Sequence, residues 1–216
     1  MDINLYHNII LNLLRKERLD IPTHRVIDQF THLAQLEIWE GMVLEYGKNQ
    51  EVQDYLAPFK VQDASFTSTA SGFVVWPEDY GYMLAASTIV FDNKVGKPNR
   101  RKLQFIPDDK LSEALDNQVR KVSVDWPVAN AGANGMDVFP KGQVSGVMSY
   151  LSMPVQPKFA YTVSGRTATY DSGNSVQLKW TDAGCKKVLI RTLMYLGLNI
   201  QDPNLIQFSQ LDKQSS

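Results

Sequence analysis

The first fifty residues carry a helical spacing of apolar positions. Leu5, Ile9 and Leu13 follow one another at intervals of four residues. Another apolar residue comes directly after each of them, at Tyr6, Ile10 and Leu14. This pattern predicts a helix with one apolar face. The segment "LDIPTH" interrupts it, and a second helix is predicted from Thr23 to Tyr46, ending at Gly47.

The second predicted helix has more apolar surface than one neighbouring element can cover. Its apolar positions cover more than one narrow stripe, and a helix of that kind packs on two sides. We therefore expect one of its neighbours to be another subunit. The predicted interface residues are Phe30, Leu33, Leu36, Trp39 and Val43.

From about residue 60 the pattern changes to short, nearly alternating runs that predict strands, separated by turn clusters such as 77–81 and 171–174. The stretch "PVANAGANGMDVFPKG" is rich in Ala and Gly, which predicts a long loop or an irregular segment. Residues 129–135 have little apolar bulk, and we expect them to order only on assembly.

The end of the chain returns to a helical pattern. Thr181 is the predicted cap, Gly197 the left-handed stop, and Cys185 lies on the apolar face. The order of elements predicts an α+β fold with an N-terminal helical hairpin, an antiparallel β-sandwich-like domain and a C-terminal helix. The predicted division is a helical segment 1–50, a β-rich domain 51–208 closed by helix 181–197, and a flexible tail 209–216.

The prolines of Pro154-x-x-Pro157 follow one strand-like run and precede another. Such spacing also occurs in polyproline ligands of aromatic grooves. Because proline cannot donate to a sheet ladder, we interpret the motif as a crossing between strands.

Composition narrows the class of protein. The chain has 216 residues, 44% of them hydrophobic, and a formal net charge of −1, which is atypical of a dedicated nucleic-acid binder and compatible with self-association. A single cysteine excludes an internal disulfide. Without a secretion signal or an apolar run of membrane-spanning length, the chain is expected to be soluble and made in a reducing cytoplasm.

Candidate chemistry is sparse. The histidines His7, His24 and His32 are interpreted as solvated or capping residues, and Cys185 as a core thiol. The acid pairs Glu78-Asp79 and Asp108-Asp109 each follow a proline at a turn, where acidic residues are locally favoured. We predict no catalytic residue, no metal site and no cofactor.

A basic run lies between two predicted strands. It places five cations within nine residues: Lys94, Lys97, Arg100, Arg101 and Lys102. A solvated hairpin loop explains such a run, and contact with DNA phosphates or with an acidic partner is the functional alternative.

Several motifs carry a resemblance when taken in order. The matching positions near the end are Tyr150, Leu151, Pro154, Pro157, Phe159, Tyr161, Leu178, Trp180 and residues 195–202. Before them come "QEVQDYLAPF", "WPEDYGYMLAAS" and "LQFIPDDKLSEAL", so the likeness spans about residues 22–208. The sequence resembles the head-to-tail connector, or neck ring, virion proteins of crAss-like phages and of related tailed phages that infect Bacteroidetes.

This resemblance implies a homo-oligomeric ring, commonly of twelve copies, around the DNA channel. The implied partners are further copies of the chain, the portal, other neck or tail proteins, and packaged DNA contacted without sequence specificity. No membrane contact is implied, and the location would be the virion, assembled in the host cytoplasm. Two alternatives stay open: a tail, baseplate or carbohydrate-binding β module, and a hydrolase that uses one of the acid pairs.

Overall fold

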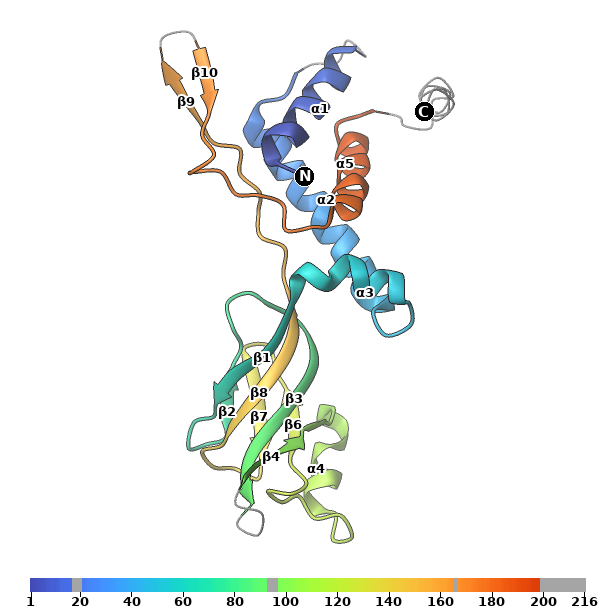
Figure 1. Ribbon diagram of the computed structural model, residues 1–216. Coiled ribbons are helices and arrows are strands. Elements are labelled where there is room, and N and C mark those ends of the chain that lie inside the picture. The colour runs from blue at the N-terminus through green and yellow to red at the C-terminus, as the bar shows by residue number, and fades with distance from the viewer. Residues whose placement is uncertain (17–20, 93–96, 165–166, 199–216) are drawn as a thin grey trace. The chain divides into compact units, whose positions relative to one another are not determined.

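The computed structural model describes residues 1–16, 21–92, 97–164 and 167–198 (Figure 1). The chain forms two compact units. The helical unit contains Met1–Phe59 and the chain from Pro154 onward, and the sheet unit contains Lys60–Met153. The sheet unit is thus inserted into the sequence of the helical unit, which differs from the predicted division after residue 50.

The helical unit has four α-helices and a two-stranded ribbon within the described residues. In chain order they are α1 (Ile3–Lys16), α2 (His24–Glu45), α3 (Gln50–Leu56) with a 3-10 turn η1 (Ala57–Phe59), β9 (Tyr161–Ser164), β10 (Thr167–Tyr170) and α5 (Asp182–Tyr195). In the sheet unit they are β1 (Lys60–Thr67), β2 (Phe73–Val75), β3 (Tyr80–Asp92), β4 (Lys97–Lys102), β5 (Gln104–Phe105), α4 (Asp108–Asp116), β6 (Val128–Ala131), β7 (Gly135–Phe139) and β8 (Ser145–Ser152). The predicted α+β class, with antiparallel sheets and helices at both ends, is confirmed.

The helix boundaries follow the capping signals. Thr181 accepts a hydrogen bond from the Gly184 amide at 3.2 Å, and Gly197 adopts a φ of 86° after α5. The α1 face differs in part from the prediction: Leu5 is exposed. The buried stripe is Ile3, Tyr6, His7, Ile10 and Leu14.

The carboxylate of Asp28 joins three segments of the helical unit. Its Oδ1 lies 2.9 Å from Nε2 of His7 in α1, and its Oδ2 accepts the Phe159 amide at 3.0 Å. The Nδ1 atoms of His7 and His24 lie 3.0 Å apart, and the His24 ring stacks on Phe159 with centroids 4.1 Å apart. The expectation of solvated histidines is therefore wrong for His7, which is fully buried.

The segment that carries Pro154 and Pro157 leaves β8 and returns the chain to the helical unit. Both proline rings are buried, and Gln35 of α2 donates to the Val155 carbonyl at 2.7 Å. The predicted crossing between strands is confirmed, since the segment connects β8 with β9. The polyproline-ligand interpretation is disfavoured because buried rings are not accessible to a groove.

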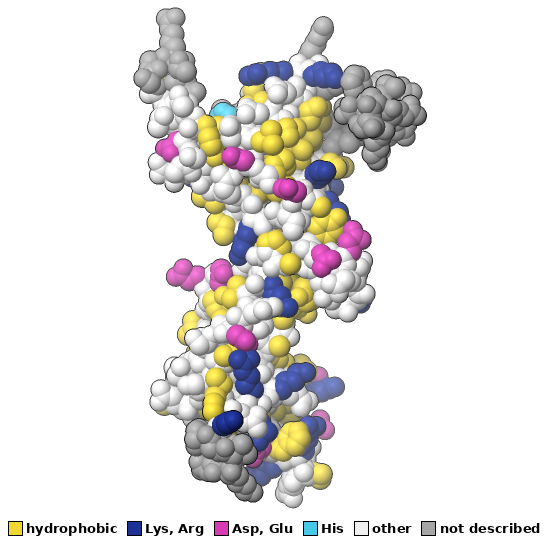
Figure 2. Space-filling model, in the orientation of Figure 1, with side chains coloured by type: hydrophobic (Ala, Val, Ile, Leu, Met, Phe, Trp, Pro, Cys, Tyr) yellow, Lys and Arg dark blue, Asp and Glu magenta, His cyan; other side chains and the backbone are white. Residues whose placement is uncertain are grey.

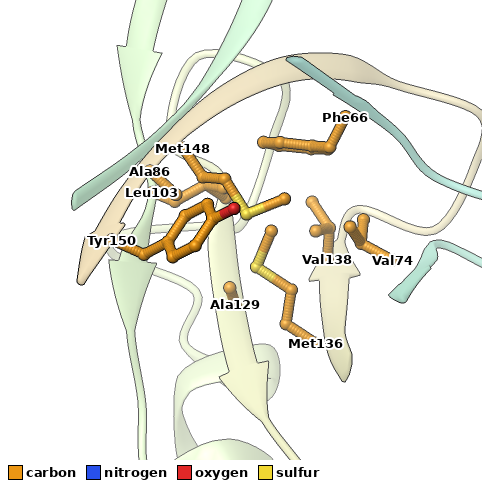
Figure 3. Packing of buried hydrophobic residues seen from close by; sticks show 9 residues of the cluster. All are labelled: Phe66, Val74, Ala86, Leu103, Ala129, Met136, Val138, Met148 and Tyr150. Carbon is orange, nitrogen blue, oxygen red and sulfur yellow. The ribbon is translucent and has the colours of Figure 1, made fainter. Parts of the chain in front are cut away.

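The sheet unit contains two four-stranded sheets with a common core. The strand orders are β1-β8-β3-β4 and β2-β7-β6-β5. Among the described strands the pairings are antiparallel, except for β5 with β6. Figure 3 shows the buried side chains of both sheets converging, among them Phe66 and Met148 from the first sheet and Val74, Met136 and Val138 from the second.

The stretch predicted as an irregular loop forms the antiparallel pair β6–β7 in the middle of the second sheet. Its small residues are required by close packing: Ala129 is fully buried. A Cβ on Gly135 would lie 2.1 Å from the Val74 carbonyl oxygen and 2.6 Å from the Phe73 ring. The prediction that 129–135 orders only on assembly is therefore wrong, because small residues here permit pairing rather than prevent it.

We expect Gly135→Ala to destabilise the protein by about 2 kcal/mol, because the methyl group has no space and the strand must shift. Gly132→Ala is the matched control at the other end of the β6–β7 turn. The nearest atom to its added Cβ is 3.6 Å away, which is ordinary contact. Urea unfolding of both variants measures the difference, and equal stabilities would show that β7 does not pack closely on β2.

At acidic pH we expect the segment around Phe159 to be held less tightly against the helices of this unit. Burial, followed by the neighbouring His7, lowers the pKa of His24. The unfolded chain, with a histidine pKa of about 6.5, therefore takes up this proton at higher pH than the folded protein. The contribution to stability is fully present above about pH 6.5 and is lost as the pH falls toward the lowered value.

The measurement is amide hydrogen exchange at Phe159 as a function of pH. Protection in the native protein should fall below about pH 6.5, and His24→Gln should flatten this profile. His32→Gln is the control. His32 lies on the same helix and burial also lowers its pKa, but its hydrogen bond within the described residues joins it to Gln35 and not to Asp28 or Phe159. An unchanged profile in His24→Gln contradicts the assignment.

Candidate functional site

An apolar groove runs between α2 and α5 on the helical unit. It encloses about 580 Å³, and its apolar lining consists of Ile38, Met42, Ile190 and Met194. Ile190 and Met194 are 48% and 47% exposed, so the groove is open to solvent. Hydrophobic side chains gather near α5 on the visible face of this unit in Figure 2.

The edge of the groove is charged. Its charged lining residues are Glu37, Glu45, Lys187 and Arg191. Arg191 Nε donates to Glu37 Oε2 at 2.7 Å, its Nη2 binds the other oxygen, and the Tyr195 hydroxyl donates to the same carboxylate. The hydrogen bond from Arg191 holds the pKa of Glu37 below its usual value. This network holds α5 against α2 and fixes one wall of the groove.

The residues predicted for a subunit interface divide into two groups. Trp39 is 5% exposed and Val43 is also buried, so both pack inside the unit rather than at its surface. Phe30 and Leu36 are half-buried, and Leu33 is 52% exposed. The interface prediction is therefore wrong for Trp39 and Val43. The physical reason is that α5, from the far end of the chain, supplies the second neighbour of α2.

The basic run lies in a strand rather than in the expected loop. Lys97, Arg100, Arg101 and Lys102 belong to β4, an edge strand, while Lys94 lies outside the described residues. Arg100 pairs with Asp63 at 2.8 Å and Arg101 with Asp125 at 3.0 Å. Lys97 and Lys102 are exposed, so they are the cations of this strand best placed for an anionic partner.

The remaining candidate groups have structural partners. Asp79 accepts the Tyr150 hydroxyl at 2.8 Å, and burial followed by this carboxylate raises the pKa of Tyr150 to about 12. Asp108 accepts from the Asn130 amide at 2.7 Å. Cys185 is fully buried, as predicted, and burial raises its thiol pKa. These contacts give one carboxylate of each acid pair, and the thiol, a structural role.

Two features were missed at the level of sequence. One is the His7–Asp28 pair, although the spacing of Ile3, His7 and Ile10 already places His7 on the buried face of α1. The other is Trp126, which is 57% exposed although tryptophan is usually largely buried. It lies beside a pocket of the sheet unit with Arg120 above its ring.

Comparison with known proteins identifies no relative: no protein-family model and no curated protein sequence matches this chain. Within the described ranges, no group of three or more histidine, cysteine, aspartate or glutamate residues is arranged to hold a metal ion. In the same part of the chain, no helix has both the length and the apolar character needed to cross a membrane.

We expect Trp39→Ala to destabilise the isolated protein by about 3–5 kcal/mol, because removal of this buried side chain leaves a cavity in the helical unit. Leu33→Ala on the exposed side of the same helix should change stability by less than about 0.5 kcal/mol. Thermal unfolding of the two variants at one concentration compares them. If Trp39→Ala changed the stability only slightly but abolished self-association, Trp39 would belong to the subunit interface as first predicted.

Proposed function

We propose that this chain is a structural subunit of a homo-oligomeric ring in the head-to-tail connector of a tailed phage, around the DNA channel. The proposed partners are neighbouring copies, the portal or other neck and tail proteins, and packaged DNA. The proposed location is the virion, after assembly in the host cytoplasm.

The observation that carries this proposal is the groove between α2 and α5. A solvent-exposed apolar groove with charges of both signs at its edge is typical of a surface that binds another protein. Its position supports self-assembly, because Ile190 and Met194 of α5 stay about half exposed beside α2 within the single chain. The order of the connector-like motifs along the chain is the second line of support.

The sheet unit fits the same proposal. Lys97 and Lys102 on β4 offer positive charge, while Arg100 and Arg101 are partly neutralised by Asp63 and Asp125. Weak, non-specific contact with phosphates needs only a few cations, and a formal net charge of −1 adds little general attraction to DNA. A ring subunit that lets DNA pass requires this balance.

A second candidate function is a carbohydrate-binding β module. One observation favours it: the indole of Trp126 is exposed beside a pocket, and aromatic faces bind sugar rings by stacking. The acid pairs give no comparable support for a hydrolase, since Asp79 and Asp108 are hydrogen-bonded within the fold.

Ring formation is tested by light scattering, with negative-stain images of the eluted species. The full-length protein should elute as closed rings, alone or with portal added, in a concentration-dependent manner. The double variant Ile190→Ser, Met194→Ser should shift the equilibrium toward monomer by at least tenfold, because two apolar side chains lose their burial at each contact.

The matched control is Leu5→Ser with Val75→Ser, which removes two apolar side chains of similar exposure outside the groove. It should assemble as the native protein does. Monomers at all concentrations, with and without portal, would contradict the proposal, and so would rings that the groove variant leaves unchanged.

A further inference from the structure

The sheet unit contains a larger pocket than the helical groove. It encloses about 740 Å³ between β5, the end of α4 and the segment that carries Trp126. Its floor is apolar, with Leu103 and Val128 buried beneath it. Its walls carry two aromatic rings, Phe105 and Trp126, and two cations, Lys102 and Arg120.

The wall that carries Arg120 and Trp126 is held in place by its own hydrogen bonds. Asn117 Oδ1 accepts the amides of Val119 and Arg120, each at 2.9 Å. Ser123 and Trp126 exchange backbone hydrogen bonds of 3.4 and 3.0 Å. The ion pair between Arg101 and Asp125 ties this wall to β4. The pocket is therefore formed before any ligand arrives, which lowers the entropic cost of binding.

The two aromatic rings are exposed in a unit that has a complete core elsewhere. Trp126 is 57% exposed and Phe105 is 37% exposed. The guanidinium of Arg120 lies 4.6 Å from the centroid of the Trp126 ring. The guanidinium lies over one face of the exposed indole, so the other face can stack on a flat aromatic ligand while the cation pairs with an anionic group attached to that ligand.

The charge of the lining selects among ligands. Lys102 and Arg120 line the pocket, and no aspartate or glutamate is among its described lining residues. A neutral sugar would be better served by carboxylates, which accept from its hydroxyl groups. An anion with an aromatic body satisfies the cations, the rings and the apolar floor together.

We propose that this pocket binds one unpaired nucleotide, with the base against Trp126 and Phe105 and the phosphate paired with Arg120 and Lys102. A base within a duplex is stacked on both faces and cannot enter. The ligand is therefore a nucleotide of single-stranded nucleic acid or a free nucleotide, which share this chemistry. The pocket and the α2–α5 groove belong to different units, so this proposal does not depend on ring formation.

The test is fluorescence anisotropy of a labelled twelve-nucleotide oligothymidine with the full-length protein at 0.1 M salt. Trp126→Ala is expected to weaken binding by about 10- to 100-fold, because it removes the stacking contact. Arg120→Gln should weaken it by about tenfold or more. Lys121→Gln is the matched control: it removes the same charge from the adjacent residue, which does not line the pocket, and should change affinity by less than threefold.

Competition by thymidine monophosphate identifies the source of the ligand. Displacement at similar nucleotide concentration indicates a free nucleotide, and displacement only by single strands indicates a nucleic acid. Equal binding of a duplex, equal effects of Arg120→Gln and Lys121→Gln, or binding of a neutral oligosaccharide that depends on Trp126 overturns the proposal. A monomer that binds the oligonucleotide would support the nucleotide pocket and contradict the ring. A ring that binds no nucleotide would support the ring and contradict the nucleotide pocket.

Discussion

The helical unit depends on one buried carboxylate. Asp28 receives hydrogen bonds from His7 in α1 and from the amide of Phe159, which the chain reaches only after the whole sheet unit. A buried charge without partners is strongly unfavourable, so both oxygens must be satisfied before α2 can pack. The site therefore makes formation of the helical unit conditional on the return of the chain to α1 and α2.

This constraint explains how the molecule divides its tasks. Because the chain leaves the helical unit after Phe59 and re-enters it at Pro154, α5 is available to cover α2. The sheet unit needs only its own two sheets for a core and leaves its edge strand and pocket free. The apolar groove and the basic, aromatic pocket consequently lie in separate units, and each can be altered by substitution without removing the other.

The sequence predicted the features that are set by local interactions, such as helix ends. It did not predict the features that depend on contacts between segments distant in the chain. The boundaries of α5 follow from Thr181 and Gly197, whose effects extend over one helical turn. By contrast, the pairing of β6 with β7 depends on β2 and on the absence of a side chain at Gly135, which local pattern reads as disorder. The basic run was expected in a loop and lies largely in β4, and Asp63 and Asp125, which pair with two of its arginines, are distant in sequence.

The burial of Trp39 and Val43 changes the energetics proposed for the ring. With α5 packed against α2, each contact in the proposed ring has a groove with two half-exposed apolar side chains, Ile190 and Met194. Completing their burial contributes about 1–2 kcal/mol each, which is too little to hold a dimer at low concentration. A closed ring differs, because every subunit makes two contacts and closure adds one without a further loss of translational freedom. Weak contacts of this size would keep single subunits apart and would still give the proposed ring once a template such as the portal brought copies together.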